Sequence, residues 1–469
     1  MVGAVVVSGF DLGDLRLPDP PARLHMIGIG GVGVSGLARM LARRGYTVTG
    51  SDLNDSPTVR DLRSEGIPVA VGHDAANVGD AELVVMTAAL RPENPELIEA
   101  TRRGIRVVKR AAVLGLLANP AVCLAVSGSH GKSTTSGMAA LALERAGLDP
   151  SFAVGATVRE LGTNARSGAG PHFVVEADEY DYSFLWLRPR VAIVTNIEHD
   201  HPDIFPDLDA VLHAFERFAA GIQHGGTLVL PAEDAGSHAL YDRLERGGYD
   251  RQIITFGEHD GDWRVNRSES GATVSGPAGQ VFELRLAVPG RHNLLNALAV
   301  LAAADGLGVD AARLVAGLDS FGGVSRRFEI LRDDDLTVVS DYAHHPTEVA
   351  ATIAAARERY PRRRIVAIFQ PHTYSRTRAL LVEFASALDA ADIVVLAEIY
   401  PAREVDSLGV ASADVAARMH RQPSVVDQAS DAAHSTRALL QPGDVVLVMG
   451  AGDIYQAAEA LAGDDTPED

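Results

Sequence analysis

The chain has 469 residues, more than one hydrophobic core usually serves, so we expect two or three domains. A formal net charge of −20 argues against a nucleic-acid partner, because such proteins normally carry a basic face. The sequence has no apolar run of about 18 residues and no basic segment before its apolar N-terminus, so we expect neither membrane insertion nor an export signal.

The number of cysteines indicates whether the protein resides in a reducing or an oxidising cellular compartment. Cys123 is the only cysteine, so no intrachain disulfide can form, and we expect a reducing, cytoplasmic location. Because Cys123 lies in an apolar segment, we expect it to be a small core residue and not a reactive thiol.

Short β-branched segments alternate with Ala- and Leu-rich helical stretches along most of the chain, a pattern typical of parallel α/β sheets. The sequence divides into three blocks, and we expect one domain in each: residues 1–111, 112–325 and 326–469. Within the second block, residues 225–288 alternate Val, Phe and Leu among Gly and Asp, which predicts a small antiparallel flap beside a parallel sheet. We therefore predict a three-domain α/β protein.

The first block opens with a predicted strand at residues 24–27, followed by a glycine-rich turn and a helical stretch at 35–44. Glycines let the backbone approach a diphosphate, the helix N-terminus supplies N–H groups, and an acidic residue after the second strand suits a ribose hydroxyl. The candidate ligand-binding residues are Gly28, Gly30, Gly31, Gly33 and Asp52.

Three interpretations of this turn stay open. By itself it is typical of an NAD-dependent dehydrogenase. A substrate that carries a diphosphate, such as a UDP-sugar, would use the same contacts without hydride chemistry. The third interpretation is a glycine turn that binds no ligand. The dehydrogenase interpretation does not account for the phosphate loop in the second block.

That second block opens with a predicted strand at 122–126, which runs into a phosphate loop and an Ala-rich helix. Backbone N–H groups of such a loop wrap phosphates, Lys132 would reach the β- and γ-phosphate oxygens, and Ser133 would offer a hydroxyl to Mg²⁺. Val126 stands where the general motif has its first glycine. The candidate ATP-binding residues here are Gly128, Ser129, His130, Gly131, Lys132, Ser133 and Thr134.

Two further predicted strands end in polar residues that we expect at the same edge of the sheet. Glu176 follows the strand at 173–175, and His201 comes shortly after the strand at 191–194. Because ligands of open α/β sheets bind beyond the carboxyl ends of strands, we predict Mg²⁺ ligation by Ser133, Glu176 and His201. A solvated acidic turn and a buried histidine are the alternatives for each residue alone.

Together with other motifs, these residues resemble the Mur ligase family along almost the whole chain. Gly128 to Thr134, Glu176-Ala177-Asp178-Glu179 and Asn196 with Asp200-His201 resemble its ATPase domain. Further similar motifs are Gly290 to Ala297 with Asn293 and Asn296, Gly162 to Arg166 with Asn164, Arg326-Arg327-Phe328-Glu329, and Asp341 to Glu348.

The resemblance implies an order of domains and a set of roles. Residues 1–111 would form a Rossmann-like domain for UDP-N-acetylmuramic acid, 112–325 a P-loop ATPase domain, and 326–469 a Rossmann-like domain for the amino acid. It implies ATP and Mg²⁺, with two ions, as cofactors. The implied roles are adenine binding by Asn293 and Asn296, ribose binding by Asp341, phosphate binding by Arg327, and contact of Asn164 with the muramoyl group.

Within the family, the sequence looks like the branch that joins L-alanine to the lactyl carboxylate of UDP-N-acetylmuramic acid in peptidoglycan precursor synthesis. The segments Asp341 to Glu348 and Phe369 to Thr377 carry this similarity. It implies that Tyr342, His344 and Arg376 bind the alanine carboxylate, and that Lys132, Glu176, His201, Arg327, His344 and Arg376 serve catalysis. The alternatives are a ligase that attaches a recycled murein tripeptide, and a nucleotide-sugar sensor without turnover.

The number of lysines limits which residues could ligate metal in the site that the resemblance implies. Of 42 basic residues, only Lys109 and Lys132 are lysines. Several Mur ligases place a carbamylated lysine about fifteen residues after the motif histidine, and no lysine follows Lys132 here. Glu216 is a native carboxylate in that region, so it would substitute for the carbamate, or it is a glutamate on a helix surface. Oligomeric state does not follow from the sequence.

Overall fold

The computed structural model describes residues 10–463, apart from 11, 14, 88–89 and 269–270. The chain forms two compact units. One unit contains Met1–Ile197, Leu212–Leu284 and Asn296–Ser320, and the other contains Glu198–Val211, Arg285–Leu295 and Phe321–Asp469. Among the described residues, no helix is both long and apolar enough to cross a membrane.

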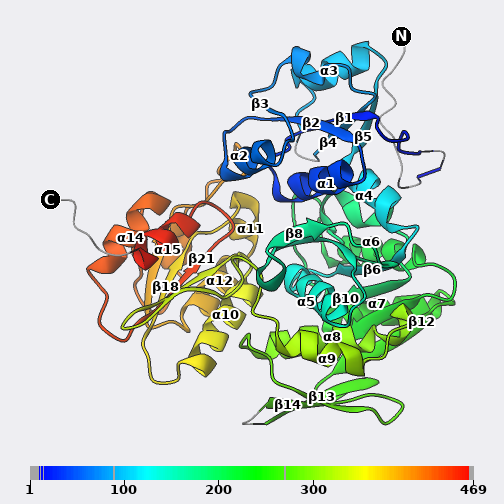
Figure 1. Ribbon diagram of the computed structural model, residues 1–469. Helices are drawn as coiled ribbons and strands as arrows, with labels where there is room; N and C mark the ends of the chain where they lie inside the picture. The colour runs from blue at the N-terminus through cyan, green and yellow to red at the C-terminus, as the bar shows by residue number, and fades with distance from the viewer. Residues whose placement is uncertain (1–9, 11, 14, 88–89, 269–270, 464–469) are drawn as a thin grey trace. The chain divides into compact units, whose positions relative to one another are not determined.

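The first unit begins with a five-stranded parallel sheet in the order β3-β2-β1-β4-β5 (Figure 1). Its strands are β1 (Arg23–Ile27), β2 (Thr47–Asp52), β3 (Val69–Val71), β4 (Leu83–Met86) and β5 (Arg106–Lys109). The helices are α1 (Val32–Arg43), α2 (Pro57–Ser64), α3 (Pro95–Arg102) and α4 (Arg110–Ala118). Helix α1 begins three residues earlier than predicted, because Gly31 takes the extended N-cap conformation directly after the turn.

A ten-stranded sheet forms the centre of this unit, in the order β15-β14-β13-β12-β11-β10-β6-β9-β7-β8. Its strands are β6 (Val122–Ser127), β7 (Ser151–Val158), β8 (Thr163–Arg166), β9 (His172–Glu176), β10 (Val191–Val194), β11 (Thr227–Pro231), β12 (Gln252–Gly257), β13 (Trp263–Ser268), β14 (Gly271–Ser275) and β15 (Val281–Leu284). Its helices are α5 (Lys132–Arg145), α7 (Ala235–Arg246) and α9 (Ala312–Asp319), together with the parts of α6 (Leu208–Ala220) from Leu212 onward and of α8 (Arg291–Ala302) from Asn296 onward.

The predicted antiparallel flap exists, but it is smaller than residues 225–288. Strands β13, β14 and β15 pair antiparallel, whereas β11 and β12 pair parallel as part of the main sheet. The reason is α7, a crossover helix between β11 and β12, which parallel pairing requires. Within the same unit, α1 of the first sheet lies beside β7 and β8 (Figure 1).

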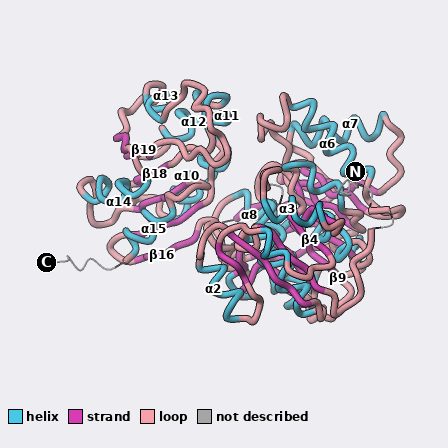
Figure 2. Tube along the Cα trace, turned by 90° about the horizontal axis from the view of Figure 1, so that it is seen from above, coloured by secondary structure: helices cyan, strands magenta, loops and turns pink. Residues whose placement is uncertain are grey.

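The second unit contains a six-stranded sheet in the order β16-β17-β21-β18-β19-β20, parallel except for β16. Its strands are β16 (Glu329–Asp333), β17 (Thr337–Asp341), β18 (Ile365–Phe369), β19 (Ile393–Ala397), β20 (Ser424–Val426) and β21 (Val445–Met449). Figure 2 shows the helices that cover it, and they are α10 (Pro346–Arg359), α11 (Tyr374–Ala379), α12 (Leu381–Leu388), α13 (Ser412–Ala416), α14 (Ala429–Arg437) and α15 (Tyr455–Ala462).

Both faces of the inner strands β17, β18, β19 and β21 are buried, which explains why these strands are mostly apolar. Along β18, Ala367 and Phe369 pack into one core with α10, α12 and α13, while Val366 and Ile368 pack into another with α14 and α15. Strands buried on both faces are typical of parallel α/β sheets. The prediction of an α/β protein is therefore confirmed by all three sheets. Cys123 is also a core residue as predicted, with an exposed fraction of 0% in β6.

Candidate active site

The phosphate loop connects β6 to α5, and glycine geometry shapes it. Gly128 has a φ of 126°, and a Cβ there would collide with the Thr195 hydroxyl and lie 2.8 Å from the Thr195 nitrogen. Only glycine fits such a position. The loop is braced from β10 by Asn196, whose carbonyl accepts from Ser129 N at 3.0 Å and whose Oδ1 accepts from His130 N at 2.9 Å.

Lys132, the first residue of α5, is curled over this loop. Its Nζ donates to the carbonyls of Gly128 (2.6 Å) and Ser129 (3.1 Å) and to Glu179 Oε1 (2.9 Å). Burial lowers the pKa of Lys132, but the carboxylates of Glu179 and Asp178 outweigh it, and the net pKa is raised. Lys132 therefore remains a cation beside the phosphate loop.

Ser133 and Glu176 lie together at the carboxyl edge of the central sheet, and their role as metal ligands stays a prediction. The Ser133 hydroxyl hydrogen-bonds to Glu176, and Glu176 Oε2 accepts from Gly155 N at 2.6 Å. Burial raises the pKa of Glu176, against the lowering effects of Gly155 N–H and Lys132. A hydroxyl and a carboxylate are oxygen donors of the kind that Mg²⁺ prefers. Thr134, next in α5, is partly exposed.

The predicted adenine-binding asparagines lie in different units. Asn296, at the centre of α8, presses against the phosphate loop, because a Cβ on Gly131 would lie 3.0 Å from its Oδ1. Asn293 donates through Nδ2 to Pro289 O at 2.6 Å. Next to it, burial and the Arg327 charge lower the pKa of His292 to about 4, so that this histidine is neutral at pH 7.

In the second unit, Glu348 of α10 organises the predicted amino-acid and phosphate residues. Its Oε1 accepts from Arg327 Nη1 at 2.9 Å, and its Oε2 accepts from His344 N at 3.0 Å. The Arg327 guanidinium also lies 5.2 Å from the Tyr342 ring centroid, and the Tyr342 and His344 rings meet edge to face at 5.3 Å. Arg327, Tyr342 and His344 thus lie together near the Glu348 carboxylate, which stands at the end of the Asp341 to Glu348 motif.

The Asp341 carboxylate, at the end of β17, accepts hydrogen bonds from residues around it. Its Oδ2 accepts from Phe328 N (2.9 Å) and Thr352 Oγ1 (3.2 Å), and its Oδ1 accepts from Ala343 N (2.8 Å). Burial raises the pKa of Asp341, and the Arg327 charge and these backbone donors oppose that effect. In this structure the carboxylate is occupied by protein donors, and its predicted contact with ribose remains a prediction.

Arg376 is 4% exposed and pairs with Asp200. Its Nε and Nη2 lie 2.8 and 2.7 Å from Asp200 Oδ1, and Nη1 donates to His372 O at 2.6 Å. Beside it, burial and the nearby His344 and Arg376 lower the pKa of His372 to about 3. Glu404 Oε1 accepts from Thr373 Oγ1 at 2.8 Å, at the start of α11.

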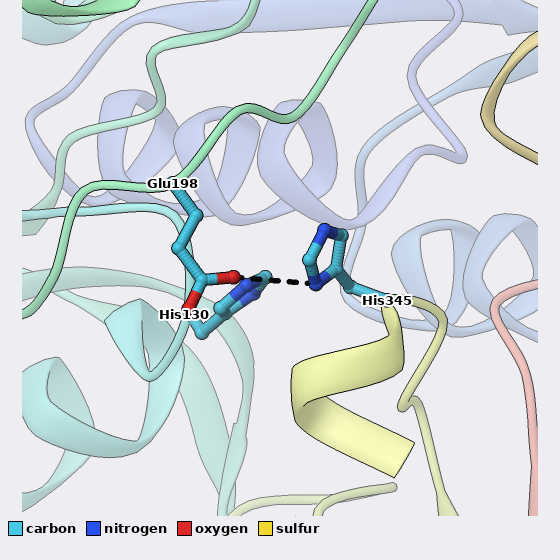
Figure 3. A group of neighbouring side chains, drawn as sticks. All are labelled: His130, Glu198 and His345. Atoms are coloured by element: carbon cyan, nitrogen blue, oxygen red, sulfur yellow. Dashed lines mark ion pairs between the residues drawn. The ribbon is translucent and has the colours of Figure 1, made fainter. Parts of the chain in front are cut away.

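The segment that carries the motif histidine belongs to the same unit as Arg376. His201 has a φ of 55°, and its N–H donates to Asp200 Oδ1 at 2.7 Å. Figure 3 shows the Glu198 carboxylate facing His345, with 3.5 Å between Oε2 and Nδ1, and Thr347 Oγ1 donates to the same oxygen at 2.8 Å. The start of α10 therefore anchors this segment.

In the first sheet, the end of β2 holds the glycine turn. The Ser51 carbonyl accepts from Gly28 N (2.9 Å) and Ile29 N (3.0 Å), and Asp52 Oδ2 accepts from Gly30 N (2.9 Å). Asp52 thus supports the turn directly, whether or not it also contacts a ribose. Asn164 is buried beside the same turn, and its Nδ2 donates to Val32 O at 3.1 Å.

Comparison with known proteins identifies the family. The chain matches three family descriptions: "Mur ligase family, catalytic domain" over residues 23–121, "Mur ligase middle domain" over 126–304, and "Mur ligase, glutamate ligase domain" over 326–452. The chain belongs to the Mur ligase family.

Individual Mur ligases are similar over nearly the full chain. A UDP-N-acetylmuramate–L-alanine ligase of Paenarthrobacter aurescens is 45% identical, covering 94% of this chain and 97% of its own. One of Mycobacterium tuberculosis is 43% identical, covering 94% of each. The crystal structure of UDP-N-acetylmuramate-alanine ligase from Thermotoga maritima matches with a TM-score of 0.77 and 31% identity, over 94% of this chain and 98% of that one. A murein peptide ligase of Psychrobacter arcticus matches with a TM-score of 0.72 and 26% identity, with the same coverage.

Glu216, predicted as a native carboxylate in place of a carbamylated lysine, lies on α6. Its Oε2 is 3.5 Å from both Arg243 Nη1 of α7 and His213 Nδ1. Such partly exposed pairs contribute little to stability. Both interpretations of Glu216 in this Mur ligase remain predictions.

Several supporting residues were not singled out from the sequence. Asn196, Asp200 and Glu348 stood only within motifs. They also pair with His130, Arg376 and Arg327, which lie 66, 176 and 21 positions away along the chain. No sequence motif marks Glu404 as a site residue, because it lies in a loop 29 residues after its hydrogen-bond partner Ser375.

Proposed function

We propose that this Mur ligase joins L-alanine to the lactyl carboxylate of UDP-N-acetylmuramic acid, with conversion of ATP to ADP and phosphate. The observation that carries the proposal is the braced phosphate loop, with Lys132 over it and the Ser133–Glu176 pair beside it. The printed names of relatives that are 43–45% identical support L-alanine as the acceptor. The product is a precursor for peptidoglycan, and the use of ATP supports a cytoplasmic location.

ATP and Mg²⁺ are the cofactors of this proposal, and the residues present suit them. Ser133 and Glu176 supply oxygen donors, and His201 completes the proposed ligand set. When bound, two Mg²⁺ ions neutralise charge on the transferring phosphoryl group. Burial raises the pKa of Glu176, and the positive charge of a bound ion would oppose that effect.

A carboxylate does not react with an amine at neutral pH, because oxide is a very poor leaving group. The proposed first step transfers the γ-phosphoryl group of ATP to a lactyl carboxylate oxygen, which releases ADP and forms an acyl phosphate. Lys132 and Arg327 stabilise the charge of that transfer. The amine of L-alanine then attacks the acyl carbon, loses a proton and expels phosphate from the tetrahedral intermediate.

The second unit supplies the proposed alanine site. Tyr342 and His344 lie edge to face, and His344 is fixed by Glu348, whose Oε2 lies 3.1 Å from its Nδ1. Arg376 would bind the alanine carboxylate with its remaining donors, since an arginine has five N–H groups and its pairing with Asp200 and His372 uses only part of them. We assign adenine binding to Asn293 and Asn296 and ribose binding to Asp341.

Phosphate release tests the proposal. Wild-type protein, ATP, Mg²⁺ and UDP-N-acetylmuramic acid are incubated with L-alanine, glycine, L-serine or the murein tripeptide. We expect one phosphate per amide formed with L-alanine, weaker release with glycine and serine, and none with the tripeptide or without an acceptor. Lys132→Ala is the control for contaminating ATPase activity.

Other outcomes would select the other functions. Release with the tripeptide and not with L-alanine would keep the Mur ligase chemistry and replace the acceptor. Binding of ATP and UDP-sugar without release under any condition would support a sensor.

A further inference from the structure

Glu404 lies in the loop that follows β19, and its carboxylate reaches the start of α11. Oε1 accepts from Thr373 Oγ1 at 2.8 Å and also from Ser375 Oγ, and Oε2 accepts from Ser375 N at 3.0 Å. The Glu404 side chain is partly buried, whereas the residues on either side of it are exposed. One carboxylate therefore joins this loop to two residues of the segment that carries Arg376.

Helix α11 is short, and its first turn depends on this carboxylate. It has six residues, fewer than an isolated helix needs to be stable in water. Thr373 is its N-cap residue, but in the part of the chain that the structure describes the Thr373 side chain makes no capping hydrogen bond to the helix. Glu404 Oε2 takes that place, because it accepts from Ser375 N in the first turn. The N–H groups there have no partner inside the helix, and negative charge beside them is favourable.

Arg376 follows Ser375 directly, so the hydrogen bond to Ser375 N fixes the backbone from which the guanidinium extends. The residues before α11 are held from the same side. Tyr400, shortly after β19, stacks on the His372 ring with 5.6 Å between the ring centroids, and its N–H donates to Pro371 O at 2.9 Å. The polypeptide after β19 therefore holds both the start and the end of the segment that carries Arg376.

We propose that Glu404 is a positioning residue of the alanine site, which holds Arg376 in place through the start of α11 and does not itself contact a substrate. This inference rests on the proposed function, in which Arg376 binds the alanine carboxylate. A planar guanidinium makes two parallel hydrogen bonds to a carboxylate only in a narrow range of orientations. Glu404 therefore affects the binding of L-alanine, and the binding of ATP and the UDP-sugar much less.

Steady-state kinetics of phosphate release test this role on the full-length protein. Glu404→Ala should raise KM for L-alanine about tenfold, as expected for the loss of hydrogen bonds to a charged group. KM for ATP and for UDP-N-acetylmuramic acid should stay within about twofold, and kcat at saturating L-alanine within about threefold, because only the binding of one substrate is weakened. The matched control is Asp406→Ala, which removes an exposed carboxylate of the same loop that accepts from Leu408 N, and it should behave as wild type.

Glu404→Gln separates the hydrogen bonds from the charge. The Ser375 N–H group can only donate, so the amide oxygen takes the place of Oε2, and the hydroxyls of Thr373 and Ser375 can accept from the amide NH2 group in the place of Oε1. Glu404→Gln should therefore keep KM for L-alanine within about threefold of wild type. A KM for L-alanine as high as that of Glu404→Ala would overturn the inference in favour of an effect of charge.

A double variant tests whether Glu404 acts through Arg376. In the Arg376→Lys background, Glu404→Ala should raise KM for L-alanine by less than about twofold, because the contact that Glu404 positions is already lost. A further rise of about tenfold there would overturn the inference, and so would equal KM values for Glu404→Ala and Asp406→Ala. A parallel loss for all three substrates would indicate a folding effect and also overturn it. If wild type did not use L-alanine at all, the proposed function itself would be wrong.

Discussion

Glu96 is a buried carboxylate at the start of α3, and its removal should destabilise the first sheet in a pH-dependent way. The residue is 0% exposed. Its oxygens accept from Ser51 Oγ at 2.6 Å and Asn77 Nδ2 at 2.7 Å, and they lie 3.2 Å from His25 Nε2. Burial raises the pKa of Glu96, but these hydrogen bonds outweigh it and lower the pKa to about 2.

The size of this effect follows from the pKa. A fall from 4.5 to about 2 corresponds to about 3 kcal/mol at about 1.4 kcal/mol per unit. We expect about 2 kcal/mol in practice, because the neighbouring His73 is 15% exposed and lets water screen the cluster. Since the folded pKa lies below the unfolded one, the stabilisation is present above about pH 4.5 and is lost as the pH falls towards about 2.

Glu96→Gln keeps the shape of the side chain and removes the charge. At pH 7 it should lower the free energy of local unfolding of the first sheet by about 2 kcal/mol, and the difference from wild type should shrink below pH 4.5. Tryptophan fluorescence does not report on this sheet, because Trp186 lies between β9 and β10 and Trp263 lies in β13, both outside it. Hydrogen exchange of peptides that cover β1 and β2, corrected for intrinsic exchange at each pH, measures the change.

A control variant on the same helix distinguishes the loss of the buried hydrogen bonds of Glu96 from a general effect of removing one negative charge. Glu99→Gln removes a carboxylate that pairs with Arg102 at the surface of α3, and it should leave protection of β1 and β2 close to that of wild type. The reasoning is refuted if Glu96→Gln loses no more protection than Glu99→Gln at pH 7, or if the two variants respond to pH alike.

Three further predictions concern catalysis. Lys132→Ala should abolish phosphate release and leave UDP-sugar affinity within twofold, since the two ligands are assigned to different sheets; a parallel loss in calorimetry would contradict this separation. His201→Ala should raise the Mg²⁺ concentration for half-maximal rate by about tenfold, because one ligand is lost; an unchanged Mg²⁺ titration would leave His201 with a structural role. Arg376→Lys should raise KM for L-alanine at least tenfold more than KM for ATP, because a point charge replaces a planar fork; equal changes in both constants would argue against a carboxylate contact.

Local motifs were predictable because their geometry depends on neighbours in the chain. The strand–loop–helix order around Lys132 follows from consecutive residues, and so does the glycine turn after β1. Helix α7 shows the limit of this approach. The apolar alternation of residues 225–288 predicted one antiparallel flap, but α7 lets β11 and β12 join the main sheet in parallel. Periodicity identifies strands, whereas the direction of their pairing depends on the connection between them.

The sequence by itself determined the α/β class, the phosphate loop and the resemblance to Mur ligases. Only the tertiary structure decided how charged side chains are paired. It joins Arg376 to Asp200, Arg327 to Glu348 and Glu96 to Ser51. The physical reason is that a hydrogen bond or ion pair depends on distances of about 3 Å between side chains, and residues far apart in the chain reach such distances only when sheets and helices pack.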